Sequence, residues 1–348
     1  MRSTFQGVTY RTAEKSAIRD YANRKAKILG RLSSYARMSW QMWRGGVPAL
    51  EILQTQFPNM AKEPRRPALV TLELTNHCDL SCPYCNSPLN LLPRGMMAKA
   101  TFTKVLEGLK GLGMHRVRVV GSGEPTLHSE FASFIAELCQ VTPFVSVLTN
   151  AQWRHPQKTI DAMLDAKVRV VEVSLNGDNK EGYEASRPGG RFERLVENLT
   201  MLKESKRLRR CRVMTNIRLM LRPSERALES RMIAFWRQYA DSVMPQYIFA
   251  LKRSAYRDDV YTPRQWEEGL YPRCSAPFKA LNVLWNGDVP LCSFSVEQIG
   301  PPGLVIGNVM TDSLSDLWHG DVMRQYRQGH YRREPDKMPI CKGCTACY

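Results

Sequence analysis

The sequence contains no run of about 18 apolar residues, which is the length an α-helix needs to cross a membrane. Its first residues, MRSTFQG, contain no apolar segment of the kind found in secretory signals, so we expect a cytoplasmic protein. Acidic residues are also scarce: 33 Asp and Glu stand against 50 Lys and Arg, which leaves a net charge of +17. This surplus attracts anions such as nucleic acid, acidic lipid headgroups or acidic substrates, and it does not choose among them.

Few cysteines stand alone. Of the ten cysteines, only Cys139 and Cys211 are isolated in sequence, and each is typical of a small buried apolar residue. The other eight fall into two groups whose spacing suggests metal binding: Cys78, Cys82 and Cys85, then Cys274, Cys292, Cys341, Cys344 and Cys347. Grouped thiols of this kind favour a reducing compartment over a disulfide framework.

The first group has the spacing C-x3-C-x2-C, which brings three thiolates together on one short loop. A 4Fe–4S cube has four irons that each take an outer ligand, so three cysteines leave one iron able to bind a small molecule. Zinc is the alternative, but structural zinc sites usually close with a fourth Cys or His nearby. His77 is adjacent to Cys78 and is too close in sequence to serve easily as that ligand.

After Pro67, short β-rich runs alternate with helical patterns, which predicts a parallel sheet covered by helices. The expected strands are Leu69–Leu74, Val117–Val120, Phe144–Leu148, Val168–Leu175, Val213–Met220 and Tyr247–Leu251. The expected helices include Thr103–Leu112, Glu130–Cys139, Pro156–Ala166 and Phe192–Ser205. Six βα units are too few for a closed eight-stranded barrel. We therefore predict an α/β fold built on an open, partial (β/α)6 TIM-like barrel.

Polar and glycine-rich motifs follow successive strands of this predicted sheet. The cysteine loop follows the first strand, Gly121–Pro125 the second, Thr149-Asn150 the third and Ser174–Gly177 the fourth. Ligands of parallel sheets bind at the carboxyl ends of the strands. The sequence therefore predicts one site that combines these motifs.

Cys78, Cys82, Tyr84 and Cys85 resemble the cluster loop of the radical S-adenosylmethionine (SAM) enzymes, including the aromatic residue before the last cysteine. The resemblance implies a (β/α)6 partial barrel and a reduced 4Fe–4S cluster that splits SAM. It also implies a 5′-deoxyadenosyl radical that abstracts hydrogen from a substrate carbon, and an electron donor such as flavodoxin or ferredoxin.

The same resemblance implies SAM contacts at the strand ends. Gly121, Ser122, Gly123, Glu124 and Pro125 resemble the family's Gly-Gly-Glu-Pro segment, with Ser122 in place of the first glycine of the pair. Glu124 or its backbone would then meet the SAM ammonium.

The remaining contacts implied by the resemblance come from other strand ends. Ser174 and Asn176 match the polar pair of the fourth strand that meets the ribose or carboxylate, although a strand-end turn explains Asn-Gly equally. The resemblance implies that Tyr84 lines the adenine of SAM. Asn150, like Asn176, is a candidate SAM contact for which a strand-end turn is the alternative. Arg187, in the loop after the fourth strand, is interpreted as a solvated loop arginine, with a position in the site as the alternative.

The second thiolate group resembles the SPASM/Twitch extension of radical SAM enzymes. Asn286-Gly287 between apolar runs predicts a hairpin that carries Cys292 back toward Cys274 and the C-terminal trio. Five cysteines fall short of the full SPASM set, so the resemblance implies one auxiliary 4Fe–4S cluster. We favour Cys274, Cys292, Cys341 and Cys344 as its ligands, with Cys347 as the alternative to Cys344; a zinc site is the other interpretation.

We predict three regions: a basic helical extension and linker over 1–66, the barrel over 67–255 and the auxiliary cluster domain over 256–348. The first region holds 13 Lys or Arg against 4 Asp or Glu. Its apolar residues between Ile18 and Trp43 recur at helical spacing, which favours a helix packed on the main domain. The alternative is a peripheral membrane contact through Trp40 and Trp43.

The expected function is oxidation or epimerisation of a small molecule or carbohydrate, because 1–66 lacks the alternating strands of a peptide-binding module. The alternative is a peptide-modifying enzyme that forms a thioether or carbon–carbon crosslink. A more distant alternative is a non-enzymatic iron–sulfur or zinc regulator that binds nucleic acid, but a mere anchor does not need polar motifs at successive strand ends. No catalytic hydrogen donor can be assigned; the candidates by topology are Tyr183, Glu172, Cys139 and Lys279.

Overall fold

The computed structural model describes residues 63–85, 87–89, 93–248, 274–293, 304–341 and 344, together with 36, 39–40, 42–44, 47–49, 52 and 259–260. The chain divides into two compact units, Met1–Met42 and Trp43–Tyr348, and the description below concerns the second. Nearly all of the predicted helix between Ile18 and Trp43 lies outside the described residues, although Trp43 itself is exposed. No described helix combines the length and apolar character needed to cross a bilayer.

A seven-stranded parallel sheet forms the centre of this unit, in the order β6-β5-β4-β3-β2-β1-β7. Six of its strands follow one another in both sequence and space, as expected of repeated βα units. The described strands are β1 (Leu69–Leu72), β2 (Arg116–Val119), β3 (Phe144–Thr149), β4 (Val170–Leu175), β5 (Met214–Leu221), β6 (Ser242–Tyr247), β7 (Ala280–Val283), β8 (Asp288–Pro290) and β9 (Val305–Asn308). Because β6 and β7 are the two edges, the predicted open (β/α) partial barrel is confirmed.

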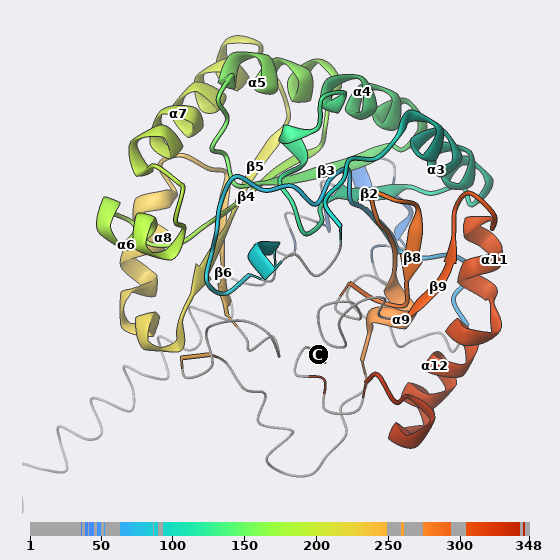
Figure 1. The fold of residues 1–348 in the computed structure, drawn as a ribbon. Helices are drawn as coiled ribbons and strands as arrows, with labels where there is room; N and C mark the ends of the chain where they lie inside the picture. The colour runs from blue at the N-terminus through green and yellow to red at the C-terminus, as the bar shows by residue number, and fades with distance from the viewer. Residues whose placement is uncertain are drawn as a thin grey trace, which may run out of the picture. The chain divides into compact units, whose positions relative to one another are not determined.

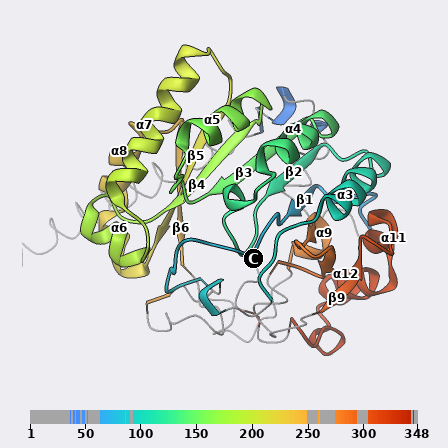
Figure 2. The same ribbon diagram turned by 45° about the horizontal axis from the view of Figure 1, so that its top comes forward.

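Helices cover the convex side of the sheet (Figures 1 and 2). The α-helices are α3 (Lys99–Gly111), α4 (Phe131–Val141), α5 (Pro156–Asp165), α6 (Lys180–Ser186), α7 (Phe192–Leu208), α8 (Glu229–Trp236), α9 (Ala276–Lys279), α11 (Leu314–His319) and α12 (Asp321–Arg332). Short 3-10 helices are η2 (Ser87–Leu89), η3 (Pro125–Leu127), η4 (Pro223–Leu228) and η6 (Pro335–Lys337). The four helices expected from sequence are all present.

Alternation along the strands separates an apolar outer face from a polar inner face. On β4, Val171, Val173 and Leu175 are fully buried and belong to the core beneath the helices. Glu172 and Ser174 lie between them in sequence, so they project to the opposite face, the lumen of the partial barrel. The sheet therefore places its polar side chains where a ligand would lie.

The position of the sixth strand needs correction. It was expected at Tyr247–Leu251, but β6 begins earlier, at Ser242, and the described strand ends at Tyr247. Its sequence SVMPQY contains a proline, which is tolerated because β6 is an edge strand and pairs only with β5. This polar, proline-containing run does not show the β-rich pattern used to find the other strands.

The hairpin prediction around Asn286-Gly287 is right about the turn and wrong about the pairing. Gly287 has φ +89°, and the backbone N–H of Leu284 donates to the carbonyl of Asp288 (2.9 Å). The strand before the turn, β7, joins the large sheet parallel to β1, whereas β8 pairs with β9 in a separate antiparallel sheet. The C-terminal region thereby adds a seventh strand to the barrel.

The helical segment of the C-terminal region is divided at Gly320 into α11 and α12. Ser313 caps α11, since its side chain accepts a hydrogen bond from the backbone N–H of Asp316 (3.0 Å). In Figure 1, α11 lies beside α3, and a Cβ built on Gly108 of α3 would lie 2.7 Å from Cγ of Leu314. Close packing at a glycine thus joins the C-terminal region to the barrel.

Candidate active site

The cysteine loop leaves the carboxyl end of β1 and is anchored by the loop after β2. The backbone N–H of Glu124 donates to the carbonyl of His77 (2.7 Å), next to Cys78. Cys82 is buried, whereas Cys78 and Cys85 are half-buried. Burial raises the pKa of the Cys78 thiol to about 12, and the nearby charges of Glu124, Asp79 and Cys82 add to the shift. The three thiols therefore share one loop beside the predicted SAM segment.

Glu124 connects the ends of three strands. One carboxylate oxygen accepts hydrogen bonds from the hydroxyls of Thr126 (2.6 Å) and Thr149 (2.8 Å), and the other accepts from the backbone N–H of Asn150 (2.7 Å). The Asn150 amide in turn donates to Asp79 on the cysteine loop (2.8 Å). Because both carboxylate oxygens already have protein donors, the side chain of Glu124 holds these loops in position.

Glycines bring the second loop close to the first. A Cβ on Gly123 would lie 2.4 Å from the carbonyl oxygen of His77, and one on Gly121 would lie 2.3 Å from Cγ of Glu73. Only glycine permits this approach. Ser122, which replaces a glycine of the family segment, is exposed and donates its backbone N–H to the Glu73 carboxylate (2.6 Å). The substitution therefore lies at a position with room for a side chain.

Arg187 lies within the site, contrary to its interpretation as a solvated loop residue. It is only 4% exposed. Its guanidinium donates to the Asn176 amide oxygen and the Ser174 hydroxyl, both at 2.8 Å. The Tyr84 hydroxyl donates to the same Asn176 oxygen (2.7 Å). Burial lowers the pKa of Arg187, but the charges of Tyr84 and Cys82 outweigh it and raise that pKa above its usual value.

The sequence offered only a weak signal for Arg187: an arginine in a Gly- and Pro-containing loop after the fourth strand. Glu73 was also missed, although it directly follows β1 and its burial raises the pKa of its carboxyl group. The sequence signal for Glu73 is a charged residue at the end of an apolar strand, shortly before the cysteine loop.

The second group of cysteines gathers around α12. The backbone N–H of Cys274 donates to the ring of His330 (3.4 Å), and the charges of Cys341 and Cys292 both act on Tyr326, one turn earlier. Cys344 follows Cys341 in a turn, with its backbone N–H donating to the Cys341 carbonyl (3.1 Å). These four cysteines are the ones we favour as ligands, and Cys347 lies outside the described residues.

The residues at the strand ends fit the predicted cofactors. The cysteine loop supplies three thiols, and the glycines at 121 and 123 let the loop after β2 pack directly against the segment that leads into it. One carboxylate oxygen of Glu73 is buried without a well-aligned hydrogen bond among the described residues, although the backbone of Trp285 and the charge of Arg94 partly offset the effect of burial on its pKa. A buried acceptor of this kind can receive a hydrogen bond from a bound polar ligand. Within the described part of the chain, no three His, Cys, Asp or Glu side chains converge on a point suited to a single metal ion.

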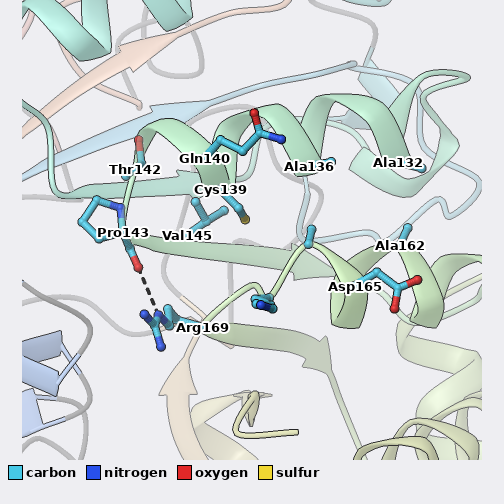
Figure 3. Close-up of a pocket in the computed structure, with 12 residues that line it drawn as sticks. Ala132, Ala136, Cys139, Gln140, Thr142, Pro143, Val145, Ala162, Asp165 and Arg169 are labelled. Carbon is cyan, nitrogen blue, oxygen red and sulfur yellow. Dashed lines mark hydrogen bonds between the residues drawn. The ribbon is translucent and has the colours of Figure 1, made fainter. Parts of the chain in front are cut away.

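A cavity of about 590 Å³ lies elsewhere, between α4 and α5 (Figure 3). It is lined by Cys139 and by residues at the opposite ends of β3 and β4 from the cysteine loop, among them Val145 and Arg169. Burial raises the pKa of the Cys139 thiol to about 12, so this thiol is protonated at neutral pH. The cavity contains none of the predicted cluster or SAM residues, and we assign it no part in the site.

The family model of the radical SAM superfamily matches residues 72–229, and the model of the SPASM iron–sulfur cluster-binding domain matches residues 274–345. The chain belongs to the radical SAM superfamily. These two domains imply SAM and 4Fe–4S clusters as its cofactors, and they indicate an enzyme. The individual cluster and SAM ligands named above stay predictions.

Curated relatives include peptide cyclases. The chain is 32% identical over 125 residues to a PqqA peptide cyclase of Rhodopseudomonas palustris, a match that covers 36% of this chain and only 32% of that protein. It is 27% identical over 320 residues to a PqqA peptide cyclase of Methylobacterium nodulans, covering 82% of this chain and 80% of the relative. Streptococcus suis SuiB bound to S-adenosylmethionine shares the fold, with a TM-score of 0.63 and 16% identity over 86% of this chain and 76% of SuiB.

Proposed function

We propose that this protein is a radical SAM enzyme that modifies a peptide by forming a thioether or carbon–carbon crosslink. The observation that carries the chemistry is the three-thiol loop joined by hydrogen bonds to the polar ends of β2, β3 and β4. The observation that carries the substrate class is the similarity to a PqqA peptide cyclase along 82% of the chain.

Cys78, Cys82 and Cys85 would hold a 4Fe–4S cluster, which would supply the electron for the reductive cleavage of SAM and hence the radical chemistry that removes hydrogen from a substrate carbon. The residues of this chain supply position and polarity for that step. Arg187 fixes the Ser174 hydroxyl and the Asn176 amide at the end of β4. Glu124 fixes Thr149 and Asn150 at the end of β3. Bound SAM would therefore lie between polar groups whose orientation is fixed by hydrogen bonds to the protein.

The sequence by itself slightly favours a small molecule or carbohydrate, because residues 1–66 lack an alternating strand pattern. The similarity to peptide cyclases supports the other alternative, and we adopt it here. A crosslink also suits a second cluster, since a substrate radical must lose one electron when the new bond is complete. Flavodoxin or ferredoxin is the expected electron donor. For residues 1–66, a peripheral membrane contact is the alternative to a helix packed on the main domain.

The test uses the full chain, reconstituted anaerobically with iron and sulfide and reduced with dithionite. With SAM, it should form 5′-deoxyadenosine, and Cys82→Ala should abolish this product while Cys211→Ala should not. A short precursor peptide encoded beside the gene should then lose two mass units for each crosslink, as measured by mass spectrometry. If the mass of the peptide does not change and the enzyme instead converts a sugar or cyclitol, the peptide proposal is wrong and the small-molecule interpretation is right.

A further inference from the structure

Four cationic side chains lie in the barrel lumen below the predicted SAM contacts. Arg116 and Arg118 are on β2, Arg218 is on β5 and Lys279 ends α9, just before β7. Arg218 pairs in register with Ser174 of β4, so it is the immediate neighbour of the site's polar layer. Glu172 lies two residues before Ser174, which places it about 7 Å deeper along the strand.

Glu172 is the one carboxylate that contacts these arginines in the described part of the chain. Its Oε2 accepts from Arg118 Nη2 (2.9 Å) and from Arg218 Nε (2.7 Å) and Nη2 (2.6 Å). Lys279 forms no ion pair with any described residue, and burial together with the charges of Arg116, Arg118 and Arg218 lowers its pKa. Within the part of the chain that the structure describes, one carboxylate therefore pairs with Arg118 and Arg218, and Lys279 adds a further cation to the same lumen.

Unused polar atoms occur in the same layer. Ser146 of β3 pairs in register with Arg118, is only 2% exposed, and its hydroxyl has no hydrogen-bond partner within the described chain. Arg118 Nε is also buried and without a partner there. The side chains of Arg118 and Arg218 nevertheless stay 24% and 16% exposed, so solvent reaches them. Buried polar atoms of this kind are normally satisfied by protein, water or ligand, and these two are available to donate to an oxyanion.

We propose that the lumen cluster, defined as Arg118, Arg218, Lys279 and Ser146, binds an anionic group of the substrate, either a carboxylate or a phosphate. Guanidinium groups pair with both kinds of oxyanion, and a hydroxyl completes the set of donors. The substrate carbon that loses hydrogen would then lie between this anchor and the ends of β2–β4. This inference rests on the proposed function, because it assigns the lumen to the substrate.

Lys279→Gln is the most direct variant, since it removes a cation that has no ion pair to lose. Lys158→Gln is the matched control, because Lys158 is exposed on α5, away from the lumen. Ligand-observed NMR titration of the reconstituted, SAM-loaded enzyme would use two probes: N-acetylglutamate amide for a peptide carboxylate and glycerol 1-phosphate for a phosphomonoester. At least one probe should bind, and Lys279→Gln should weaken it about tenfold while Lys158→Gln leaves it unchanged.

The stronger of the two probes identifies the source of the anion. Binding of neither probe, or equal binding by Lys279→Gln and the native enzyme, would overturn the inference. The double variant Arg218→Gln with Glu172→Gln removes one charge of each sign and should weaken the same probe. Formation of 5′-deoxyadenosine is measured in parallel. If it proceeds while the anion arm fails, only this inference is lost; if the anion binds as expected but no 5′-deoxyadenosine forms, only the proposed function is lost.

Discussion

Arg187 shows how one buried side chain can organise the end of a strand. It is hydrogen-bonded to Ser174 and Asn176, and its guanidinium lies 5.9 Å from the centre of the Tyr84 ring. These partners come from β4, the loop after β4 and the cysteine loop, so Arg187 couples the predicted SAM contacts to the cluster loop. A charged group buried to this degree is stable only because its donors are used.

Arg187→Gln should therefore weaken SAM binding at least tenfold and cost about 2 kcal/mol of stability, because charge-assisted hydrogen bonds are lost and their partners stay buried. Arg191→Gln is the control, because Arg191 is exposed and its hydrogen bonds to Gln152 use only its backbone N–H and carbonyl. Equilibrium dialysis with SAM and urea unfolding measure the two effects. Native SAM affinity in Arg187→Gln would show that the arginine serves the fold alone.

Glu172 provides a pH test. Burial alone would raise its pKa, but Arg118 and Arg218 outweigh burial and lower the pKa to about 2, from an ordinary value of 4.5. A carboxyl group whose pKa is depressed by folding stabilises the protein above the unfolded pKa. That stabilisation disappears as the pH falls from about 4.5 toward 2, and it amounts to roughly 3 kcal/mol.

Glu172→Gln should remove this part of the acid dependence and should destabilise the protein at pH 7 by about 3 kcal/mol or more, because the arginines lose their counter-charge. Urea unfolding of the native and variant chains at pH 7 and pH 3 gives both values. The difference between the two proteins should shrink at pH 3. A constant difference would mean that the carboxylate is not ionised in the folded protein.

At the scale of elements, the strand and helix pattern of the barrel could largely be predicted from sequence, since buried β-branched runs such as Val170-Val171 alternate with amphipathic helices. The sixth strand was predicted too late in the sequence. As an edge strand, β6 tolerates Pro245 and polar residues, so it lacks the β-rich pattern by which strands are predicted. β7 could not be anticipated as a barrel strand, because its partner β1 lies about 210 residues earlier in sequence and only tertiary packing selects it.

For the site, as for the fold, sequence could predict the local motifs but not the contacts made by tertiary packing. Motifs at strand ends could be read from the sequence, because their place in a parallel sheet is set by topology. The partners of those motifs could not, because hydrogen bonds such as Arg187 to Ser174 depend on how a loop folds back over a strand. Sequence named Glu172 and Lys279 only as candidate hydrogen donors, and it could not group Lys279 with Arg118, Arg218 and Ser146, because these residues lie on different elements of the fold.

The junction of α3 and α11 gives an element-scale prediction. Gly108 and Gly111 both lie in α3; a Cβ at 108 would lie 2.7 Å from Leu314, whereas a Cβ at 111 would meet nothing within 4 Å. Gly111→Ala should stabilise the protein by up to about 1 kcal/mol through helix propensity. Gly108→Ala should instead destabilise it by about 1–3 kcal/mol, because α11 must move. Urea unfolding compares the pair, and equal stabilisation by both would mean that α11 does not pack on α3.

At the scale of the whole molecule, the barrel and the C-terminal region are joined through β7 and through α11, and each carries its own group of cysteines. Lys279 ends α9, five residues after Cys274 and directly before β7. The charge of Cys274 and those of Arg116, Arg118 and Arg218 all act on it, so the C-terminal cysteine region borders the cationic side of the barrel at this point.

Iron content tests this two-site arrangement. The anaerobically reconstituted chain should hold about eight irons, four for each cluster. Cys274→Ala combined with Cys292→Ala should reduce this to about four and still form 5′-deoxyadenosine, because the first three cysteines stay intact. Cys82→Ala should also hold about four irons but form none of that product. Iron assay, electron paramagnetic resonance and product analysis on the same samples separate the two sites. Four irons in the unaltered chain, or zinc retained in equal amount to protein after chelation, would replace the auxiliary cluster with a structural zinc site.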